Sequence, residues 1–338
     1  TTRKNLPAAL ELVFDAMHNS IMPQDEFDQF KKQMQVMIES MRDKPDALAQ
    51  NAITQHFNTY PKGDPRYEYS LDESLEQLNK LTVDQVRAFY KEFGGTSRGE
   101  ISIVGDFDPK AVEKIIRNDY AKYVSKAHYA PVVTEYRPVK ATRVVIDTPD
   151  KENAIIVARS VFPINDTAPD APALTVANWI LGGGTGLSNR LIERLRQKEG
   201  LSYGAGSHVR IPAKGNNGSF VFRAIVAPQN MLQAEASARD VIAKAIKDGF
   251  TDQEVEEAKK GLLQAMQVAR SQDNVVARSW NDKMENQRTW AFSKKQAEAI
   301  SKLTTADVNA ALRKYIKPDE ITFVLAGDQK KAAQKKQD

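Results

Sequence analysis

The residues best suited to chemistry are an arginine and a tyrosine, Arg196 and Tyr203, which lie seven residues apart. Both side chains donate hydrogen bonds, so together they can bind a carbonyl oxygen or stabilise an oxyanion. Apolar residues at every fourth position between 187 and 195 predict a helix, and Gly200 is suited to end it. Alternating side chains from Leu201 onward predict a strand. The sequence therefore holds a guanidinium and a phenol near each other where a helix meets a strand.

Each of these two residues also has a structural explanation. A cation in the last turn of a helix is stabilised by the helix dipole by roughly 0.3–1 kcal/mol, which accounts for Arg196 and equally for Lys198. Tyrosine is a good strand former, which accounts for Tyr203. His208, farther along the same predicted strand, is either a substrate contact or an exposed strand histidine. Residue types alone leave both explanations open.

A run of glycines, Gly182, Gly183, Gly184 and Gly186, precedes the predicted helix, whose N-terminus Ser188 can cap. The run lacks the Gly-Lys-Ser/Thr ending of a P-loop, and it follows a predicted helix rather than a strand. This pattern argues against a phosphate-binding loop. The simplest interpretation is a flexible connection between two helices.

The segment from residue 188 to residue 203 resembles the signature of the C-terminal half of the pitrilysin/insulinase family of zinc metallopeptidases, the inverzincins. The positions that match in type and spacing are Ser188, Arg190, Leu191, Leu195, Arg196, Lys198, Gly200, Leu201 and Tyr203. The resemblance implies that Arg196 and Tyr203 reach across from a non-zinc domain and hold a peptide substrate near its scissile bond. It also implies that the glycine run lies near the path of the peptide.

The sequence contains no motif for zinc chemistry. A zinc peptidase needs two histidines one helical turn apart and a carboxylate general base, and neither HxxEH nor HExxH occurs. The four histidines, none with this spacing, are His18, His56, His128 and His208. Glu39 lies on a helix comparable to one that carries a further zinc ligand in the family. Without a histidine motif, we expect Glu39 to be a solvated helix residue.

The resemblance therefore implies two halves with different tasks. Zinc would be bound by an N-terminal half of the same protein that lies outside this sequence. The present chain would bind the peptide, complete the closed chamber of a zinc endopeptidase, and be inactive by itself. The alternative is a non-enzymatic subunit, a peptide-binding or scaffold protein with a degenerate peptidase fold. An HxxEH motif in the N-terminal half would distinguish the two.

A long internal repeat divides the chain. The segment 80–106 recurs at 302–328, an offset of 222 residues, and the segment 24–32 recurs at 252–260, an offset of 228. In the second copy, about ninety residues lie between the linker and the helix that matches the start of the chain, and the first copy has no equivalent of them. We therefore expect a first domain truncated at its N-terminus, in a chain that is a fragment. The predicted organisation is a truncated domain at 1–126, a linker at 127–140, a complete domain at 141–328 and a basic tail at 329–338.

The order of predicted elements indicates an α+β fold of two homologous domains, each an antiparallel sheet with a helical layer on one face. In the first copy, a helix at 83–93 is followed by a strand at 100–104. The strands predicted for the second copy lie at 143–147, 154–162, 201–211, 219–226 and 321–325.

The composition is that of a globular protein with about two domains: 338 residues, 41% hydrophobic and 27% charged. No apolar run approaches the roughly 20 residues needed to span a bilayer. The net charge of +4 is too small and too scattered to indicate nucleic-acid binding. The lack of cysteine excludes disulfides and cysteine metal sites. It suits the periplasm, the location that we predict, and it is equally compatible with the cytoplasm.

Overall fold

The computed structural model describes residues 1–184 and 189–334 of the chain. Its contacts divide the chain into two compact units. Unit 1 comprises Thr1–Glu39, Asp72–Pro131 and Ala269–Thr289, and unit 2 comprises Ser40–Leu71, Val132–Val268 and Trp290–Asp338. The predicted end of the first domain at residue 126 and the predicted start of the second at residue 141 divide the chain by sequence repeat and not by contacts. These two boundaries stay predictions.

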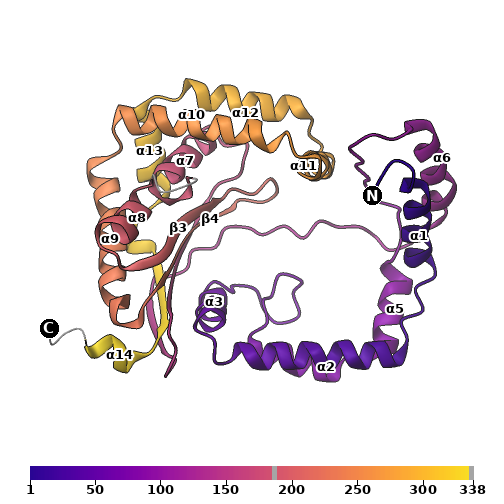
Figure 1. Ribbon diagram of the computed structural model, residues 1–338, viewed down its shortest axis with the longest axis horizontal. Helices are drawn as coiled ribbons and strands as arrows, with labels where there is room; N and C mark the ends of the chain where they lie inside the picture. Colours follow the sequence, from indigo (N-terminus) through magenta and orange to yellow (C-terminus); the bar gives the residue numbers. More distant parts are fainter. Residues whose placement is uncertain (185–188, 335–338) are drawn as a thin grey trace. The chain divides into compact units, whose positions relative to one another are not determined.

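Unit 2 is built on a five-stranded sheet with the order β1-β5-β2-β4-β3. Figure 1 labels two neighbouring strands of this sheet, β3 and β4. Neighbouring strands are antiparallel except β1 and β5, which are parallel. The predicted strands of the second copy all form, and their ends lie within two residues of the predicted ones. Their bounds are β1 Arg143–Asp147, β2 Ala154–Pro163, β3 Ser202–Arg210, β4 Asn217–Val226 and β5 Thr322–Gly327.

Helices cover both faces of this sheet. On one face, the core includes Phe222 of β4 and Leu312 of α13, both fully buried, together with residues of α7 and α9. On the other face, Ala49 and Ile53 of α3 lie in a second cluster with Val157 of β2. A strand covered on both faces is expected to be apolar nearly throughout, as β2 is. The predicted helical layer is therefore present, and α3 also covers part of the face that was predicted to be open.

The helices of unit 2 surround this sheet. They are α3 Pro45–His56, α7 Ala171–Asn178, η2 Trp179–Gly183, α8 Arg190–Ile192, η3 Glu193–Lys198, η4 Pro228–Asn230, α9 Met231–Asp248, α10 Asp252–Ala269, α12 Trp290–Lys302, α13 Thr305–Tyr315, η5 Pro318–Glu320 and α14 Gln329–Gln334. Those of unit 1 are α1 Leu6–His18, α2 Gln24–Met41, α4 Leu71–Lys80, α5 Val83–Phe93, α6 Pro109–Asp119, η1 Tyr120–Lys122 and α11 Asp273–Glu285. Among the described residues, none of these helices has the length and apolar character required to cross a membrane.

The two sequence copies fold into matching elements. Helices α2 and α10 have the same length and differ by 228 in their numbering, and α5 and α13 match in the same way with an offset of 222. Thr82 and Thr304 begin α5 and α13 with the same reciprocal capping box. Just before each cap, a carbonyl accepts a hydrogen bond from Lys31 at 2.8 Å or from Lys259 at 2.9 Å. These two pairs of helices therefore match in length and spacing.

The strand predicted at residues 100–104 is not formed. The described part of unit 1 contains no strand, so these residues have no partner with which to form one there. Their counterpart β5 is paired on both sides, and its Phe323, which packs in the main core, is only 1% exposed whereas Ile101 is 36% exposed. A strand depends on the hydrogen bonds of its neighbours. The prediction was wrong because the sequence pattern reports a strand's side chains and not its partners.

Candidate functional site

The segment 190–198, called the motif helix below, joins one α-helical turn, α8, to a π-helical turn, η3. Its cap is Asn189, whose Oδ1 accepts a hydrogen bond from the Ile192 N–H at 2.9 Å. Ser188, the predicted cap, lies outside the described residues. Leu191 and Leu195 are fully buried in the main core. These two leucines fix the helix to unit 2 by the apolar spacing that the sequence shows.

The C-terminal part of the motif helix is wider than the predicted α-helix. The Glu199 N–H donates to the Arg194 carbonyl at 3.1 Å, and the Leu201 N–H donates to the Leu195 carbonyl at 2.8 Å. Gly200 ends the helix with φ +61°, a conformation that glycine adopts without strain. π-Helical turns are rare and are found frequently at functional sites. The apolar spacing could not reveal this turn because it is compatible with an α-helix.

Tyr203 lies in a β-bulge at the start of β3. Ser202 pairs with Val226 and Gly204 pairs with Ile225, so Tyr203 is an extra residue without a ladder partner. The Ser202 hydroxyl holds the bulge, because it accepts from the Gly204 N–H at 3.0 Å and donates to the Ile225 carbonyl at 2.9 Å. Bulges redirect side chains next to active sites. The Tyr203 side chain is accordingly 68% exposed.

Arg196 is exposed on η3, a segment that contacts β3. The other cations of the motif helix are engaged: Arg190 pairs with Glu254, Arg194 with Glu199 and Lys198 with Glu193. Within the described part of the chain, Arg196 has no ion-pair partner. Both predicted site residues are therefore exposed, on adjoining elements, and Arg196 is the cation of this helix that no described residue pairs with.

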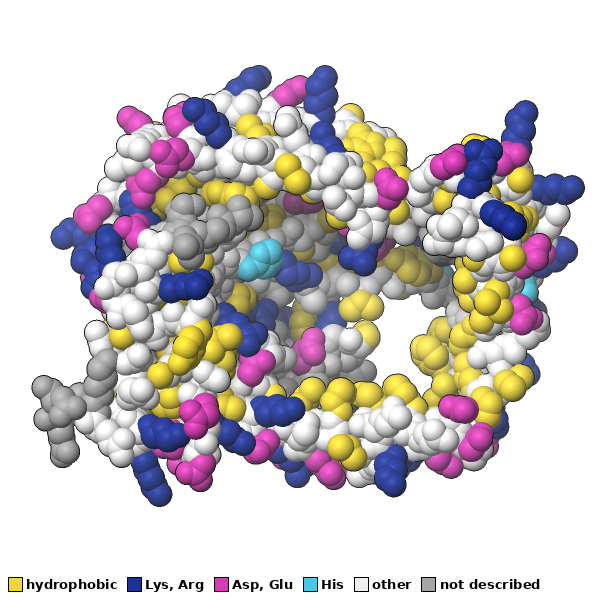
Figure 2. Space-filling model, in the orientation of Figure 1, with side chains coloured by type: hydrophobic (Ala, Val, Ile, Leu, Met, Phe, Trp, Pro, Cys, Tyr) yellow, Lys and Arg dark blue, Asp and Glu magenta, His cyan; other side chains and the backbone are white. Residues whose placement is uncertain are grey.

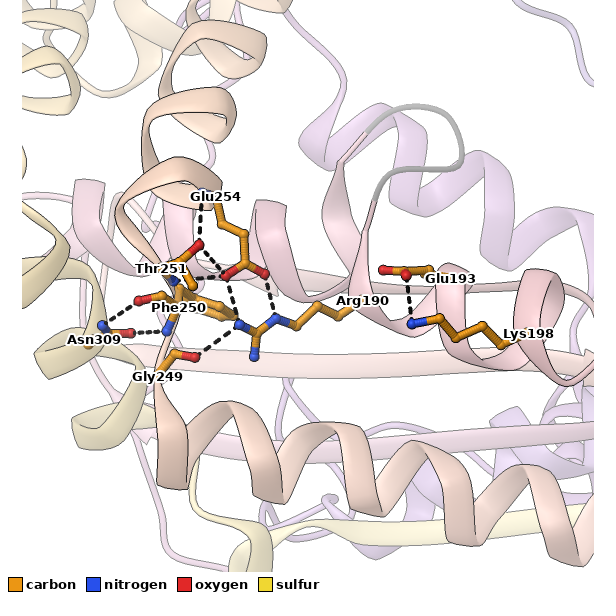
Figure 3. A network of polar contacts seen from close by, with 8 residues as sticks. All are labelled: Arg190, Glu193, Lys198, Gly249, Phe250, Thr251, Glu254 and Asn309. Carbon is orange, nitrogen blue, oxygen red and sulfur yellow. Dashed lines mark hydrogen bonds and ion pairs between the residues drawn. The ribbon is translucent and has the colours of Figure 1, made fainter.

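Arg190 is a positioning residue that the sequence alone did not identify. Its Nε and Nη2 donate to the two carboxylate oxygens of Glu254 at 2.7 and 2.8 Å, and Nη2 also donates to the Gly249 carbonyl at 3.0 Å (Figure 3). The guanidinium lies 4.7 Å from the ring centre of Phe250. These contacts fix the first turn of the motif helix to the junction of α9 and α10. The sequence signal that could have identified Arg190 is its match to an arginine of the family signature.

The Glu254 carboxylate is held in its charged form by this network. Burial raises the pKa of Glu254, but hydrogen bonds from Arg190 and from Thr251 outweigh burial and lower it overall. The Thr251 N–H donates to Glu254 at 2.8 Å, and its hydroxyl donates at 3.0 Å (Figure 3). A carboxylate that accepts several hydrogen bonds is stabilised as the anion. The support of the motif helix is therefore electrostatic as well as apolar.

The glycine run packs closely against β3. A Cβ on Gly182 would lie 2.5 Å from the Ser207 Oγ and 2.7 Å from its N, and one on Gly183 would overlap the Asn178 amide. Ser207 also donates to the Asn178 Oδ1 at 2.8 Å. Gly182 and Gly183 end the π-helical turn η2, so they form a packed turn and not the predicted flexible connection. Gly186 lies outside the described residues, and the place of this run beside a peptide stays a prediction.

No cluster of three or more metal-ligating side chains occurs among the residues that the structure describes. Glu39 is exposed on α2, as expected for a solvated helix residue. His56 is close to the Lys140 carbonyl, 2.9 Å from its Nε2. The described residues therefore do not fit a zinc ion.

Two curated relatives match about three quarters of the chain. One is the non-peptidase homolog YmxG of Helicobacter pylori, 21% identical over 256 residues, or 76% of this chain and 58% of the relative. The other is an uncharacterized zinc protease of Mycobacterium tuberculosis, 24% identical over 261 residues, or 76% of this chain and 57% of the relative. The chain thus spans less than two thirds of the length of these relatives.

Solved structures share the fold. The peptidase M16 inactive domain from Pseudomonas fluorescens has a TM-score of 0.81 at 23% identity, over 94% of this chain and 74% of the other. The periplasmic protease PqqL from Escherichia coli has a TM-score of 0.62 at 16% identity, over 90% of this chain and 33% of the other. At such identities the likeness concerns the fold alone.

A family profile described as "Peptidase M16 inactive domain" matches residues 80–262, a stretch that includes the motif helix, the bulge and both site residues. This match and the zinc proteases among the relatives confirm the resemblance read from the sequence. Since the match covers more than half of the 338 residues, the chain belongs to the peptidase M16 inactive-domain family.

Proposed function

We propose that this chain is the substrate-binding half of a zinc endopeptidase and that Arg196 and Tyr203 hold the peptide. The observation that carries the proposal is the state of the motif helix: its other cations are in ion pairs, whereas Arg196 is exposed beside a bulge that exposes Tyr203. An arginine and a tyrosine that have no partner among the described residues are ready donors for an incoming acceptor.

The acceptor in this proposal is a backbone carbonyl of the peptide. Arg196 and Tyr203 orient that carbonyl, and their hydrogen bonds strengthen as negative charge develops on its oxygen during hydrolysis. A donor of this kind contributes about 3 kcal/mol, or a factor of 10²–10³ in rate. The supporting elements are rigid, because Leu191 and Leu195 are buried and Arg190 ties the helix to Glu254.

The remaining parts of the catalyst come, in this proposal, from a partner. The described residues do not fit zinc, so the metal and the general base belong to an N-terminal half, with which this chain encloses the peptide. The zinc proteases among the relatives support a zinc enzyme, and the periplasmic protease among the structural neighbours supports a periplasmic location. We expect the isolated chain to be inactive.

The experiment is a reconstitution assay. The chain is mixed with its N-terminal half, and cleavage of a quenched fluorescent peptide is measured with wild type, Arg196→Ala, Tyr203→Phe and Lys198→Ala. We expect the first two variants to lose a factor of about 10²–10³ in kcat/KM. The control Lys198→Ala removes a neighbouring charge whose partner is Glu193, and it should keep most activity. Full activity of Arg196→Ala would refute the assigned role.

One observation favours a second candidate function, a non-enzymatic peptide-binding or scaffold subunit. The relative from Helicobacter pylori, which matches 76% of this chain, is named a non-peptidase homolog. In that case the N-terminal half would lack HxxEH and reconstitution would give no cleavage. Peptide binding that depends on Arg196 and Tyr203 would persist for a peptide-binding subunit and would be absent for a scaffold.

A further inference from the structure

Three basic side chains share one face of the sheet, between the inner strand β2 and the edge strand β3. Arg159 of β2 pairs with Val221 of β4, which pairs in turn with His208 of β3, so the three residues form one row across the strands. Arg210 follows His208 by two residues on β3, which places it on the same face. Figure 2 shows histidine and basic side chains next to each other over β3 and β4.

This face is only partly covered. Helix α3 packs over its centre, and the ring of Phe57, which follows α3, lies 4.8 Å from the Arg159 guanidinium. Arg223, one row away, already pairs with Asp46 at 2.6 Å. His208 and Arg210 are exposed, and Arg159 is half-buried. The three cationic or ionisable groups therefore border an open part of the sheet.

Among the described residues, Arg159 and Arg210 lack the carboxylate partners that arginines in a protein often have. The Arg159 Nε is buried without a hydrogen-bond acceptor, and within the described part of the chain neither arginine forms an ion pair. Burial lowers the pKa of Arg159 and the charge of Arg210 lowers it further, while Glu68 opposes them only in part. A partly buried guanidinium without an acceptor is unfavourable. Keeping such a guanidinium next to a second, exposed arginine is understandable if an anion binds between Arg159 and Arg210.

We propose that Arg159, Arg210 and His208 bind a carboxylate side chain of a peptide ligand. A guanidinium presents a planar fork of donors that matches a carboxylate with two parallel hydrogen bonds. The proposal rests on the proposed function for the nature of the ligand, a peptide. His208 follows Tyr203 by five residues on β3, about 17 Å at ~3.4 Å per residue. A peptide held at Tyr203 that continued along β3 would bring an acidic residue over these cations.

The test uses the whole chain and two extended peptides with blocked ends that differ only in one central residue, Glu or Gln. Binding is measured by titration calorimetry at physiological ionic strength. We expect the Glu peptide to bind about tenfold more tightly, the effect of one charge-assisted pair. Arg159→Met and Arg210→Met should abolish that ratio, whereas Arg196→Ala should weaken both peptides and keep it. The matched control Arg278→Gln, on α11, removes one exposed positive charge elsewhere and should change nothing.

The other outcomes distinguish a failure of the carboxylate site from a failure of the proposed peptide-binding function. Equal binding of the two peptides would overturn the carboxylate site and leave peptide binding intact. A Glu preference that survived in an Arg159→Met, Arg210→Met double variant would assign the effect to overall charge and also overturn it. If neither peptide bound, the proposed function would fail. Free glutarate then tests the cations alone: saturable binding lost in the double variant would show a small-carboxylate site, and no binding would reject the site.

Discussion

Replacing Arg190 with methionine should loosen the motif helix although Arg190 is not a ligand contact. Methionine keeps most of the apolar stem but removes the two hydrogen bonds to Glu254 and the one to the Gly249 carbonyl. It also leaves the Glu254 carboxylate, only 30% exposed, without its counterion. The expected result is a loss of stability and faster hydrogen exchange at the amides of the motif helix.

The magnitude follows from the exposure of the pair. Hydrogen bonds to charged groups contribute roughly 1.5–3 kcal/mol each when protected from water, and breaking a fully buried ion pair costs about 3–5 kcal/mol. Arg190 and Glu254 are 25% and 30% exposed, so we expect a loss of about 2–3 kcal/mol in the free energy of unfolding. The control Lys198→Met breaks the Lys198–Glu193 pair on the same helix (Figure 3), which is 65% and 47% exposed. That variant should lose less than about 1 kcal/mol.

The pH dependence gives the sharper assay. The folded-state pKa of Glu254 is lowered, so its contribution to stability is present above its usual value near 4.5 and is lost as the pH falls through the folded-state value. In Arg190→Met, Glu254 stays partly buried but loses its counterion, so the folded-state pKa of Glu254 rises. The stability difference between wild type and variant should therefore be largest near pH 7 and shrink below about pH 4. Urea unfolding at both pH values measures it. A difference below about 1 kcal/mol at pH 7, or one independent of pH, would refute the reasoning.

Three further predictions use matched positions. Gly183→Ala should lower the free energy of unfolding by roughly 1–3 kcal/mol because the added Cβ has no room. Gly204→Ala, whose added Cβ meets no described atom within 4 Å, should leave thermal unfolding unchanged. Val308→Ala removes two buried methyl groups and should lower the free energy of unfolding by about 1.6 kcal/mol before any cavity cost. Val86→Ala, at the partly exposed equivalent position in the other copy, should lower it by less than half as much, as measured by urea titration. Ser202→Ala removes the hydroxyl that holds the bulge, so peptide affinity should fall, as we also expect for Tyr203→Phe, while the unfolding free energy falls by about 1 kcal/mol.

Local chemistry made much of the fold predictable. Thr82 and Thr304 mark the starts of two helices because a threonine followed three residues later by Gln or Asp can close a capping box. The buried strands were recognisable because a strand with apolar residues on both sides, such as β2, can be stable only inside a sheet. The repeat then placed the equivalent helices of both copies without any structural information.

The parts that could not be predicted depend on distant partners. Residues 100–104 have the pattern of β5 but no neighbouring strand in the described structure, so the same pattern gives a strand in one copy and not in the other. The bulge at Tyr203 is an offset between β3 and β4, which a single strand's sequence does not encode. Helix α3 covers strands that lie far from it in the chain, such as β2 and β5, a contact set by packing and not by local pattern.

The dipole explanation for Arg196 can now be separated from the binding explanation. Arg194 and Lys198 lie at the same helix end, but each is neutralised by a glutamate. An interaction with the helix dipole depends only on a positive charge at position 196 and not on the shape of the group that carries it. Arg196→Lys keeps the charge but loses the planar fork of donors. If the dipole explanation is correct, this variant leaves both stability and peptide affinity unchanged. If Arg196 binds a carbonyl together with Tyr203, stability is unchanged but affinity falls, since an ammonium on a flexible stem does not reproduce the geometry of the guanidinium.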